Sequence, residues 1–280
     1  MKITFIVLTY DRSDALIAVL DSLACQCNQN HQVIIADDGS RKEQVQFLFD
    51  CLPTFRCPVL HVWHPDVGFT IARARNLAAS YATGEYLVFL DGDCIANSAF
   101  VAQHERLAEV GYFVNGSRVL LSKRLTTDVI QRGLDLSGQS VQFWLRARLH
   151  GDCNKLSHLL GWPKKLFRVK KTFRWSGLRG CNLGVWMQDF ISVNGFDESF
   201  EGWGHEDADF VLRLSHLGVQ RKNGFLATEV FHLWHKESKR DYESINRNRV
   251  LARLETDVVR AEKGLQELDT ALSVEITTLN

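Results

Sequence analysis

The amino-acid sequence predicts an α/β protein built on a doubly wound, mostly parallel sheet. In the first ninety residues, short apolar runs of strand length alternate with segments whose apolar residues recur at helical spacing. The runs at 3–8 and 86–90 are rich in apolar residues, as strands covered on both faces should be. Polar or acidic residues follow three of the four runs. Because ligands of such sheets bind beyond the carboxyl ends of the strands, we expect the functional site there.

The elements of this first part follow in chain order. Ser13 and Asp14 can cap the first helix, and Gly84 is placed to end the third. The expected strands lie at residues 3–8, 33–36, 59–63 and 86–90, and the expected helices at 13–23, 43–50 and 70–81. A helix at 98–109 and a strand in two pieces, 113–114 and 119–121, continue the sheet.

The pattern weakens after residue 122, and no element is assigned from Lys123 to Trp175. Order returns with an ordered segment at 177–187, a helix at 206–216 stopped by Gly218, and a last strand at 227–231. From residue 241 onward an apolar stripe on a charged segment predicts one helical tail, which could pack on the domain, pair with a second copy or lie on a membrane. The expected units are a domain of 1–240, with halves 1–122 and 123–240, and a C-terminal helical extension of 241–280.

Composition excludes several classes of protein. The 33 Lys and Arg balance 33 Asp and Glu, so the chain lacks the basic surplus of a protein that binds nucleic acid by bulk electrostatics. No apolar run approaches the length of a membrane span, and the N-terminus lacks the pattern of a signal peptide. We therefore expect a cytoplasmic protein. The seven cysteines include no C-x-x-C pair, which favours reduced thiols over a disulfide framework or a structural zinc site.

The neutral total conceals two charged segments. Residues 197–209 hold six acids and no Lys or Arg, whereas residues 164–174 hold six bases and no acid. The basic segment, Lys164–Arg174, interleaves cations with aromatic residues and could touch an anionic acceptor or the inner face of a membrane. A plain solvated face is the alternative.

An acidic turn follows the fourth expected strand. Asp91-Gly92-Asp93 offers two carboxylates, and neither the Gly-x-Gly-x-x-Gly pattern nor the P-loop pattern occurs in the sequence. Carboxylates repel phosphate unless a divalent cation lies between them, and oxygen ligands of this type bind Mg²⁺ or Mn²⁺. Asp207-Ala208-Asp209 has the same spacing but follows no buried strand, so the first copy is the stronger candidate. A solvated turn is the alternative.

A second constellation, Phe200–Asp209, combines glycines, a tryptophan and acids. The glycines beside Trp203 leave room for a sugar ring to approach the indole face. Glu206 and Asp207 fall at an expected helix N-terminus, where the dipole favours their ionised form, and one of them could act as a general base. The alternative is an N-capped helix with a packed tryptophan.

Two histidines, His232 and His235, directly follow the last expected strand. An imidazole beside two carboxylates suits Mn²⁺ better than Mg²⁺. Two histidines on Zn²⁺ are the alternative, although no third ligand lies near them at ordinary spacing.

Together these motifs resemble the family 2 glycosyltransferases of GT-A fold, which use nucleotide sugars. The resemblance covers roughly residues 1–240. Gly202-Trp203-Gly204-His205-Glu206-Asp207 is similar to the acceptor-side motif of β-1,4-galactosyltransferases and chondroitin-type polymerases. The N-terminal part rests on Thr9-Tyr10-Asp11-Arg12, Ile35-Ala36-Asp37-Asp38-Gly39-Ser40, Gly68 through Ala74-Arg75-Asn76, and Leu90-Asp91-Gly92-Asp93. The resemblance implies a Rossmann-like nucleotide half and a mixed acceptor half.

The resemblance also implies roles for the matching residues. On the nucleotide side, Thr9, Tyr10 and Arg12 would line the base and ribose pocket, and Asp37 and Asp38 would contact uracil. Arg75 would hold the nucleotide side, and Asp91 would meet both the ribose and the metal. Asp93 would be the principal metal ligand, completed by His232. Asp207 would be the catalytic base, with Glu206 binding sugar hydroxyls, Trp203 beside the sugar and Asn182 facing the donor. His205 stands where the family more often has glycine, which narrows the space near the sugar.

The implied activity is a metal-dependent, inverting transfer of a hexose or N-acetylhexosamine from a UDP-sugar to a hydroxyl of a glycan or glycolipid acceptor, of the cell-surface polysaccharide or lipopolysaccharide type. A nucleoside diphosphate leaving group stabilised by Mn²⁺ or Mg²⁺ needs no protein acid, which is consistent with a single base opposite a metal site. Retention is the alternative, because the Gly-Trp-Gly-x-Glu-Asp pattern also resembles part of a retaining family. Two other classes are an inactive sugar-nucleotide-binding scaffold and a nucleotidyltransferase, although the latter needs a Gly-rich loop after the first strand and Thr9-Tyr10-Asp11-Arg12 is not one.

Overall fold

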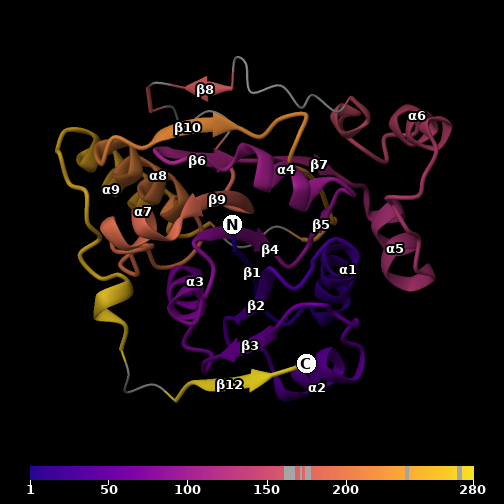
Figure 1. Cartoon of the computed structure of the whole chain (residues 1–280), viewed down its shortest axis with the longest axis horizontal. Helices are drawn as coiled ribbons and strands as arrows, with labels where there is room; N and C mark the ends of the chain where they lie inside the picture. The colour runs from indigo at the N-terminus through magenta and orange to yellow at the C-terminus, as the bar shows by residue number, and fades with distance from the viewer. Residues whose placement is uncertain (161–167, 171, 174–177, 237–239, 270–272) are drawn as a thin grey trace.

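The computed structural model describes residues 1–160, 168–170, 172–173, 178–236, 240–269 and 273–280. Within them a nine-stranded sheet has the order β12-β3-β2-β1-β4-β9-β6-β10-β8, and a three-stranded sheet has the order β5-β11-β7 (Figure 1). The strands are β1 Ile3–Thr9, β2 His31–Asp37, β3 Val59–Trp63, β4 Tyr86–Asp91, β5 Cys94–Ala96, β6 Tyr112–Asn115, β7 Ser117–Leu120, β8 Val169–Lys170, β9 Asn182–Trp186, β10 Gln220–Asn223, β11 Glu229–His232 and β12 Glu275–Thr278. The helices are α1 Ser13–Ala24, α2 Lys42–Asp50, α3 Ile71–Ser80, α4 Phe100–Leu107, α5 Lys123–Arg132, α6 Val141–Leu149, α7 Met187–Ser192, α8 Glu206–His216 and α9 Glu243–Leu254.

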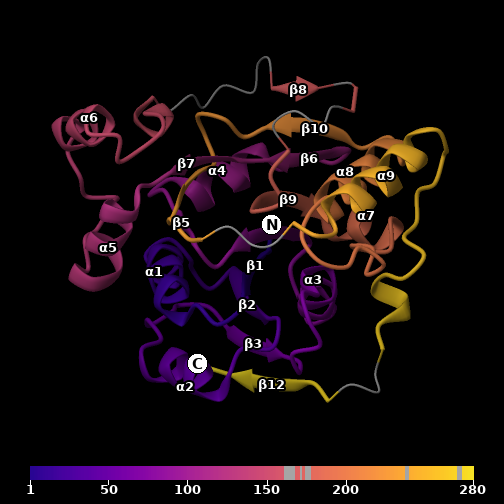
Figure 2. The ribbon, with the colours of Figure 1, turned by 180° about the vertical axis from the view of Figure 1, so that it is seen from behind.

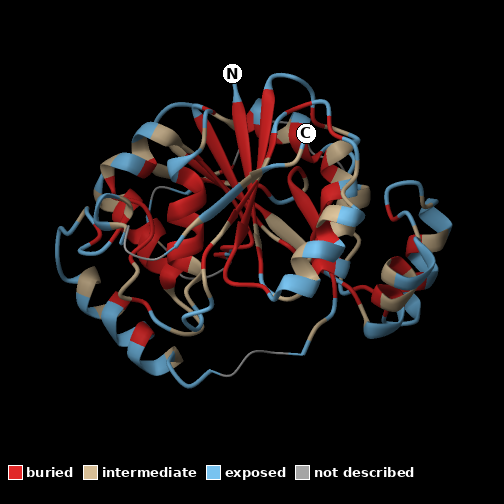
Figure 3. Ribbon diagram, turned by 90° about the horizontal axis from the view of Figure 1, so that it is seen from below, coloured by how far each residue is buried: buried red, intermediate tan, exposed pale blue. Residues whose placement is uncertain are grey.

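The N-terminal half is the doubly wound sheet that the sequence predicts. Strands β3, β2, β1 and β4 are parallel neighbours. Alternate residues of β1 face opposite layers: Phe5 and Val7 pack in a core with α1 and α2, while Ile6 packs with α3. Figure 3 shows the buried strands between helices on both sides. The apolar runs that predicted β1–β4 are therefore covered on both faces, and this part of the fold is confirmed.

The C-terminal half is mixed, also as expected. Strand β9 runs antiparallel to both β4 and β6, whereas β6 and β10 are parallel. The strand expected in two pieces at 113–121 is in fact two strands in different sheets, β6 and β7. Gly116 lies at the break, where a Cβ atom would come within 2.1 Å of the Asn182 amide. Glycine at this point lets the chain pass close to β9 and leave the large sheet.

The expected helical tail is wrong beyond Leu254. Helix α9 packs on α8, and its Asn246 and Val250 are buried. From there the backbone bonds to the domain: Ala261 N–H donates to Val193 O, and Leu265 N–H to Asn194 O. These tertiary bonds replace the i to i−4 bonds that a continuing helix would need. The chain ends in β12, a β-branched segment that pairs antiparallel with β3 at the sheet edge.

The segment from Lys123 to Trp175, in which the sequence shows no clear pattern, contains α5, α6 and β8. Figure 2 shows α5 and α6 projecting from the end of the molecule that lies away from α9. The basic segment Lys164–Arg174 lies partly outside the described residues. Among the residues that the structure describes, no helix is long and apolar enough to cross a membrane.

Candidate active site

The carboxyl ends of β1, β2 and β4 lie at one edge of the sheet because the three strands are parallel and in register. Thr9 is paired with Asp37, and Leu8 with Asp91. Gly92 follows β4 and donates its N–H to Leu8 O over 2.7 Å. A Cβ atom at Gly92 would lie 2.6 Å from that oxygen, so glycine is required for this approach. The turn therefore holds Asp91 and Asp93 beside the end of β1.

The small sheet brings two histidines to this turn. Strand β11 pairs antiparallel with β5, which places His232 opposite Cys94. His232 Nε2 lies 3.8 Å from Asp93 Oδ1, and His235 Nε2 lies 3.2 Å from Asp93 Oδ2. Leu233 N–H donates to Asp93 O over 2.8 Å, which fixes the two strands at this point.

The donor set of this cluster suits a divalent cation. Ligand atoms of Asp93, Cys94 and His232 lie within 4.8 Å of one another. Burial and a hydrogen bond with Cys181 raise the pKa of the Cys94 thiol well above its ordinary value. A carboxylate with imidazoles is a donor set that Mn²⁺ accepts. The residues present therefore fit the metal that the sequence predicts, with His235 available in addition to His232.

Arg75 joins the two halves of the site. This side chain, 3% exposed on α3, donates to Asp91 Oδ1 over 3.0 Å and to Glu206 Oε1 over 3.1 Å. Its guanidinium carbon also lies 5.1 Å from the centre of the Phe196 ring. Burial lowers the pKa of Arg75, but the carboxylates around it outweigh this effect and raise the pKa overall. The strand-end turn and the start of α8, far apart in the sequence, are thus held together by one buried cation.

The first turn of α8 carries the expected carboxylates. Burial and the neighbouring Asp207 raise the pKa of Glu206 to about 7, against the lowering effect of Arg75. Asp207 is half-buried, and its Oδ2 accepts the N–H of Gly180 over 2.8 Å. Asp209, the other acid of the second Asp-x-Asp, is fully buried and paired with Arg213 over 2.8 Å. Asp209, which also pairs with Arg253, therefore serves the core and not the site.

The loop before α8 adopts backbone conformations that favour glycine. Gly202 and Gly204 have φ of 69° and 103°, and His205 follows with φ of 73°. His205 is a residue other than glycine in the left-handed region, which is consistent with the glycine that the resembling family more often has there. Trp203 is half-buried, with the Arg240 guanidinium 4.7 Å from its ring centre.

Helix α9 supports this loop, a feature that sequence reasoning missed. Asn246, 1% exposed, donates from Nδ2 to Glu201 O and to Gly204 O, each over 3.0 Å. A Cβ atom at Gly202 would lie 2.6 Å from the Tyr242 ring, so the loop and the helix are in close contact. In the sequence Asn246 is one polar residue of a charged helix, and nothing there identifies its partner.

The acids expected to contact uracil are engaged inside the protein. Asp37 is 1% exposed, pairs with His61 Nε2 over 2.9 Å and accepts the Ser40 N–H over 2.8 Å. Asp38 is also buried and accepts from both the N–H and the hydroxyl of Thr70. Both carboxylates lie at the edge of the site and are paired with groups of the protein itself.

The other expected nucleotide-side residues line the end of β1. Thr9 is buried, and its hydroxyl oxygen has no hydrogen-bond partner among the described residues. Tyr10 is 49% exposed and donates its hydroxyl to Asp66 over 3.0 Å, which raises the pKa of Tyr10. Arg12 is half-buried beside Asp14. This side of the site therefore offers an exposed phenol ring and a cation next to the buried acids.

Asn182, expected to face the donor sugar, is not brought to the site surface. It is fully buried, and its Nδ2 donates to Thr228 O over 2.6 Å. Its Oδ1 lies 3.2 Å from His104 Nε2. The break at Gly116 leaves the space that this amide occupies. In this structure Asn182 joins the two sheets instead of lining the site.

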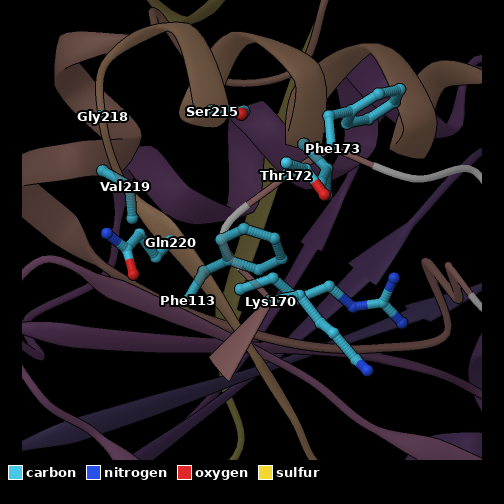
Figure 4. A pocket seen from close by; sticks show the side chains of 10 residues that line it. Phe113, Lys170, Thr172, Phe173, Ser215, Gly218, Val219 and Gln220 are labelled. Atoms are coloured by element: carbon cyan, nitrogen blue, oxygen red, sulfur yellow. The ribbon is translucent and has the colours of Figure 1, made fainter. Parts of the chain in front are cut away.

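A cavity of about 190 Å³ lies elsewhere (Figure 4). It is lined by residues that include Phe113 and Gln220, at the beginnings of β6 and β10, and Lys170 of β8. Ser215 near the C-terminal end of α8 also lines it, whereas Asp207 is at the opposite end of that helix. We therefore assign the site to the strand ends and not to this cavity.

Comparison with solved structures defines the class of protein. The chain resembles TarS 1–349 of S. aureus, with a TM-score of 0.54 and 15% identity over 94% of this chain and 66% of that chain. It also resembles the mannosyltransferase PcManGT of Pyrobaculum calidifontis, with a TM-score of 0.55 and 17% identity over 89% and 61%. A third neighbour is GalNAc-T7, with a TM-score of 0.58 and 14% identity over 90% and 48%. The fold is that of the GT-A glycosyltransferases.

Sequence comparison then gives the family. A model of glycosyl transferase family 2 matches residues 4–149, more than half of the chain, and the chain belongs to this family. A second model, the N-terminal domain of galactosyltransferase, matches residues 165–236. Validoxylamine A glucosyltransferase of Streptomyces hygroscopicus subsp. jinggangensis is 28% identical over 229 residues, which are 78% of this chain and 52% of that protein. The chain spans about half the length of the curated relatives it matches.

Proposed function

We propose that the protein is a metal-dependent, inverting glycosyltransferase that moves a hexose or N-acetylhexosamine from a UDP-sugar to a hydroxyl of a glycan or glycolipid acceptor. The observation that carries this proposal is the buried Arg75, which bridges Asp91 on the strand-end turn to Glu206 at the start of α8. A candidate reactive group follows each bridged acid closely: Asp93 comes two residues after Asp91, and Asp207 directly follows Glu206. The Asp91-Gly92-Asp93 turn and the proposed base Asp207 are thereby held in fixed relative positions.

The choice of donor is supported by related proteins. TarS 1–349 has a solved complex with UDP-GlcNAc, and PcManGT one with GDP-Man and Mn²⁺. We place the base and ribose at Thr9, Tyr10 and Arg12, because these residues lie at and just beyond the end of β1, next to the acidic turn. Asp37 and Asp38 belong to the same pocket in this proposal, and their buried pairs with His61 and Thr70 would shape its wall. The acceptor proposed is of the cell-surface polysaccharide or lipopolysaccharide type.

In the proposed mechanism, each residue acts from its observed position. Asp93 and His232, with Asp91 or His235, would hold Mn²⁺ or Mg²⁺, which when bound stabilises the charge of a pyrophosphate leaving group. Asp207 would accept the proton of the acceptor hydroxyl as that oxygen attacks the anomeric carbon from the face opposite the nucleoside diphosphate leaving group. Its Oδ2 is oriented by the Gly180 N–H, which fixes the carboxylate for this task.

The other two residues of the acceptor side would bind sugar. Glu206, with its pKa raised to about 7, would accept or donate hydrogen bonds to sugar hydroxyls, and Trp203 would stack on a sugar ring. A single base opposite a metal site predicts inversion, which NMR of the product's anomeric configuration tests. A retained configuration contradicts this part of the proposal.

The substitution Asp207→Asn tests the function directly. The variant keeps the shape of the side chain but removes the base, so we expect turnover to be lost while UDP binding is preserved. Asp257→Asn is the matched control, because Asp257 is an exposed acid beyond α9. Turnover of Asp207→Asn at the rate of the control contradicts the proposed base. UDP binding without turnover in the unsubstituted protein supports the alternative of an inactive sugar-nucleotide-binding scaffold.

Peripheral membrane contact through Lys164–Arg174 and pairing of two copies through the C-terminal helix extend the proposal. The buried face of α9 already packs on α8, so pairing through this helix would use its exposed residues.

A further inference from the structure

Helix α6 has an apolar stripe that the protein leaves uncovered. Val141, Leu145 and Leu149 follow one another at a spacing of four residues and therefore lie on one face of the helix. They are 58%, 48% and 85% exposed, and Leu160, shortly after the helix, is 65% exposed. Single exposed leucines are common on protein surfaces, but an aligned set on one projecting helix marks an interaction surface.

The opposite face of α6 is anchored to the body of the protein. Trp144 is 2% exposed and stacks on Phe231 of β11, with ring centres 4.9 Å apart and planes inclined by 6°. Ala147 is buried on the same face. Helix α6 is thus apolar on both sides, and the inner side leads through Phe231 to His232 of the candidate metal site. The exposed stripe is held at a fixed position relative to the active site.

The charged side chains of α6 itself have one sign: the helix holds Arg146 and Arg148 and no acid. The nearest acids along the chain are Asp135, exposed six residues before the helix, and Asp152 after it. Asp152 is 3% exposed and paired with Arg124, so it offers no negative charge to an outside partner. Arg146 and Arg148 are exposed on α6 and pair with no carboxylate in the described part of the chain. An apolar stripe with flanking cations is the pattern of helices that lie in the interface of anionic membranes.

We propose that the outer face of α6 docks on the surface of a bilayer that contains anionic lipids. The α6 stripe consists of Val141, Leu145 and Leu149, with Arg146 and Arg148 beside it. In this arrangement the leucines enter the boundary between headgroups and acyl chains while the guanidinium groups stay at the level of the lipid phosphates. The proposal goes beyond glycosyl transfer itself, and vesicle binding reports on it without any turnover.

A second copy of the chain fits the stripe less well. Two stripes in contact would bring the arginines of both copies together, and like charges at close range oppose association. Stable protein interfaces also bury about 800 Å² on each partner, far more than three side chains of one short helix provide. Charge and size both favour the lipid surface.

Vesicle flotation tests the α6 stripe. We expect the protein to float with vesicles of phosphatidylcholine and phosphatidylglycerol but not with phosphatidylcholine alone. The double variant Leu145→Glu/Leu149→Glu should reduce the partition coefficient at least about tenfold, since even one leucine contributes about a factor of ten when buried. Arg146→Gln/Arg148→Gln should weaken binding and its dependence on salt. Because both leucines are exposed, the double variant should keep the unfolding midpoint of the wild type in urea.

The matched control is Val110→Glu, since Val110 is 79% exposed in the turn between α4 and β6, outside the stripe. We expect this variant to float as the wild type does. Equal flotation of the wild type and the double leucine variant overturns the proposal, because binding would then use another segment such as Lys164–Arg174. Absence of flotation with anionic vesicles also overturns it. So does a dimer in analytical ultracentrifugation that the double variant dissociates while flotation is unchanged.

Discussion

Replacing Glu206 with glutamine tests the buried charge network around Arg75 in the candidate active site. Glu206 is buried at the start of α8, where Arg75 links it to Asp91. Burial and the charge of Asp207 raise its pKa from 4.5 to about 7, although Arg75 acts in the opposite direction. Glutamine has nearly the same shape and can still accept the hydrogen bond from Arg75. The substitution therefore removes the titration and leaves most of the packing in place.

The sign and size of the effect follow from the difference between the folded and unfolded pKa. The folded state holds the proton of Glu206 more tightly than the unfolded state does, so its contribution to stability is fully present below pH 4.5 and is lost as the pH rises through 7. A difference of one pKa unit between the folded and unfolded states corresponds to about 1.4 kcal/mol of unfolding free energy. Between pH 5 and pH 8 the wild type should therefore lose roughly 2 to 3 kcal/mol of unfolding free energy relative to Glu206→Gln.

Urea denaturation of both proteins at several pH values, with EDTA present, measures this difference. Effects of the substitution that do not depend on pH shift the two curves by a constant and cancel in the comparison. We expect the stability of the wild type and the variant to diverge steadily from pH 5 to pH 8, with the variant gaining. Parallel curves over this range would refute the raised pKa and with it the buried position of the carboxyl group.

Three further perturbations address other parts of the structure. Arg253→Met leaves Asp197 and Asp209, both fully buried, without a shared cation, and should cost about 3 kcal/mol or more of unfolding free energy in urea; an unchanged midpoint contradicts it. Asn246→Asp removes both hydrogen bonds to the loop before α8 and should lower the kcat of transfer at least about tenfold with UDP affinity unchanged; a parallel loss of UDP affinity speaks against a positioning role. Burial lowers the pKa of His104 to about 4, so its neutral form stabilises the fold above pH 6.5 and that stability is lost as the pH falls toward 4. In the variant His104→Gln the urea midpoint should depend less on pH over this range. An unchanged pH dependence of the midpoint counts against the lowered pKa of His104.

The fold was predictable where local pattern and burial agree. Strands β1–β4 are buried on both faces, so each is an apolar run, and the helices between them show helical spacing. Strand β10 was missed because its sequence, Gln220–Asn223, is polar; its buried Lys222 pairs with Glu109 and donates to Leu107 O. Helix α6 gave no clear period because apolar residues lie on both of its faces. Tertiary contacts decide these elements, and a local pattern does not record them.

The candidate site, like the fold, was predictable from the sequence only in part. The resemblance to the family implies that the acidic turn and His232 meet in one metal site, and the structure places His232 Nε2 3.8 Å from Asp93 Oδ1. The bridge from Arg75 to Glu206 spans 131 residues, and its partners cannot be inferred from spacing. The support of the loop by Asn246 depends on how α9 packs, which the sequence does not show. Long-range hydrogen bonds were therefore the part that only the structure reveals.

The most direct test of the proposed function is a titration of Mn²⁺ into EDTA-treated protein, with hydrolysis or transfer of a panel of UDP-sugars and GDP-sugars as the readout. We expect at least one UDP-sugar to be turned over only after Mn²⁺ or Mg²⁺ is added, and Asp93→Asn to abolish this response. Undiminished turnover in EDTA, or a response to Mn²⁺ that Asp93→Asn leaves intact, would contradict the proposed metal site at the end of β4.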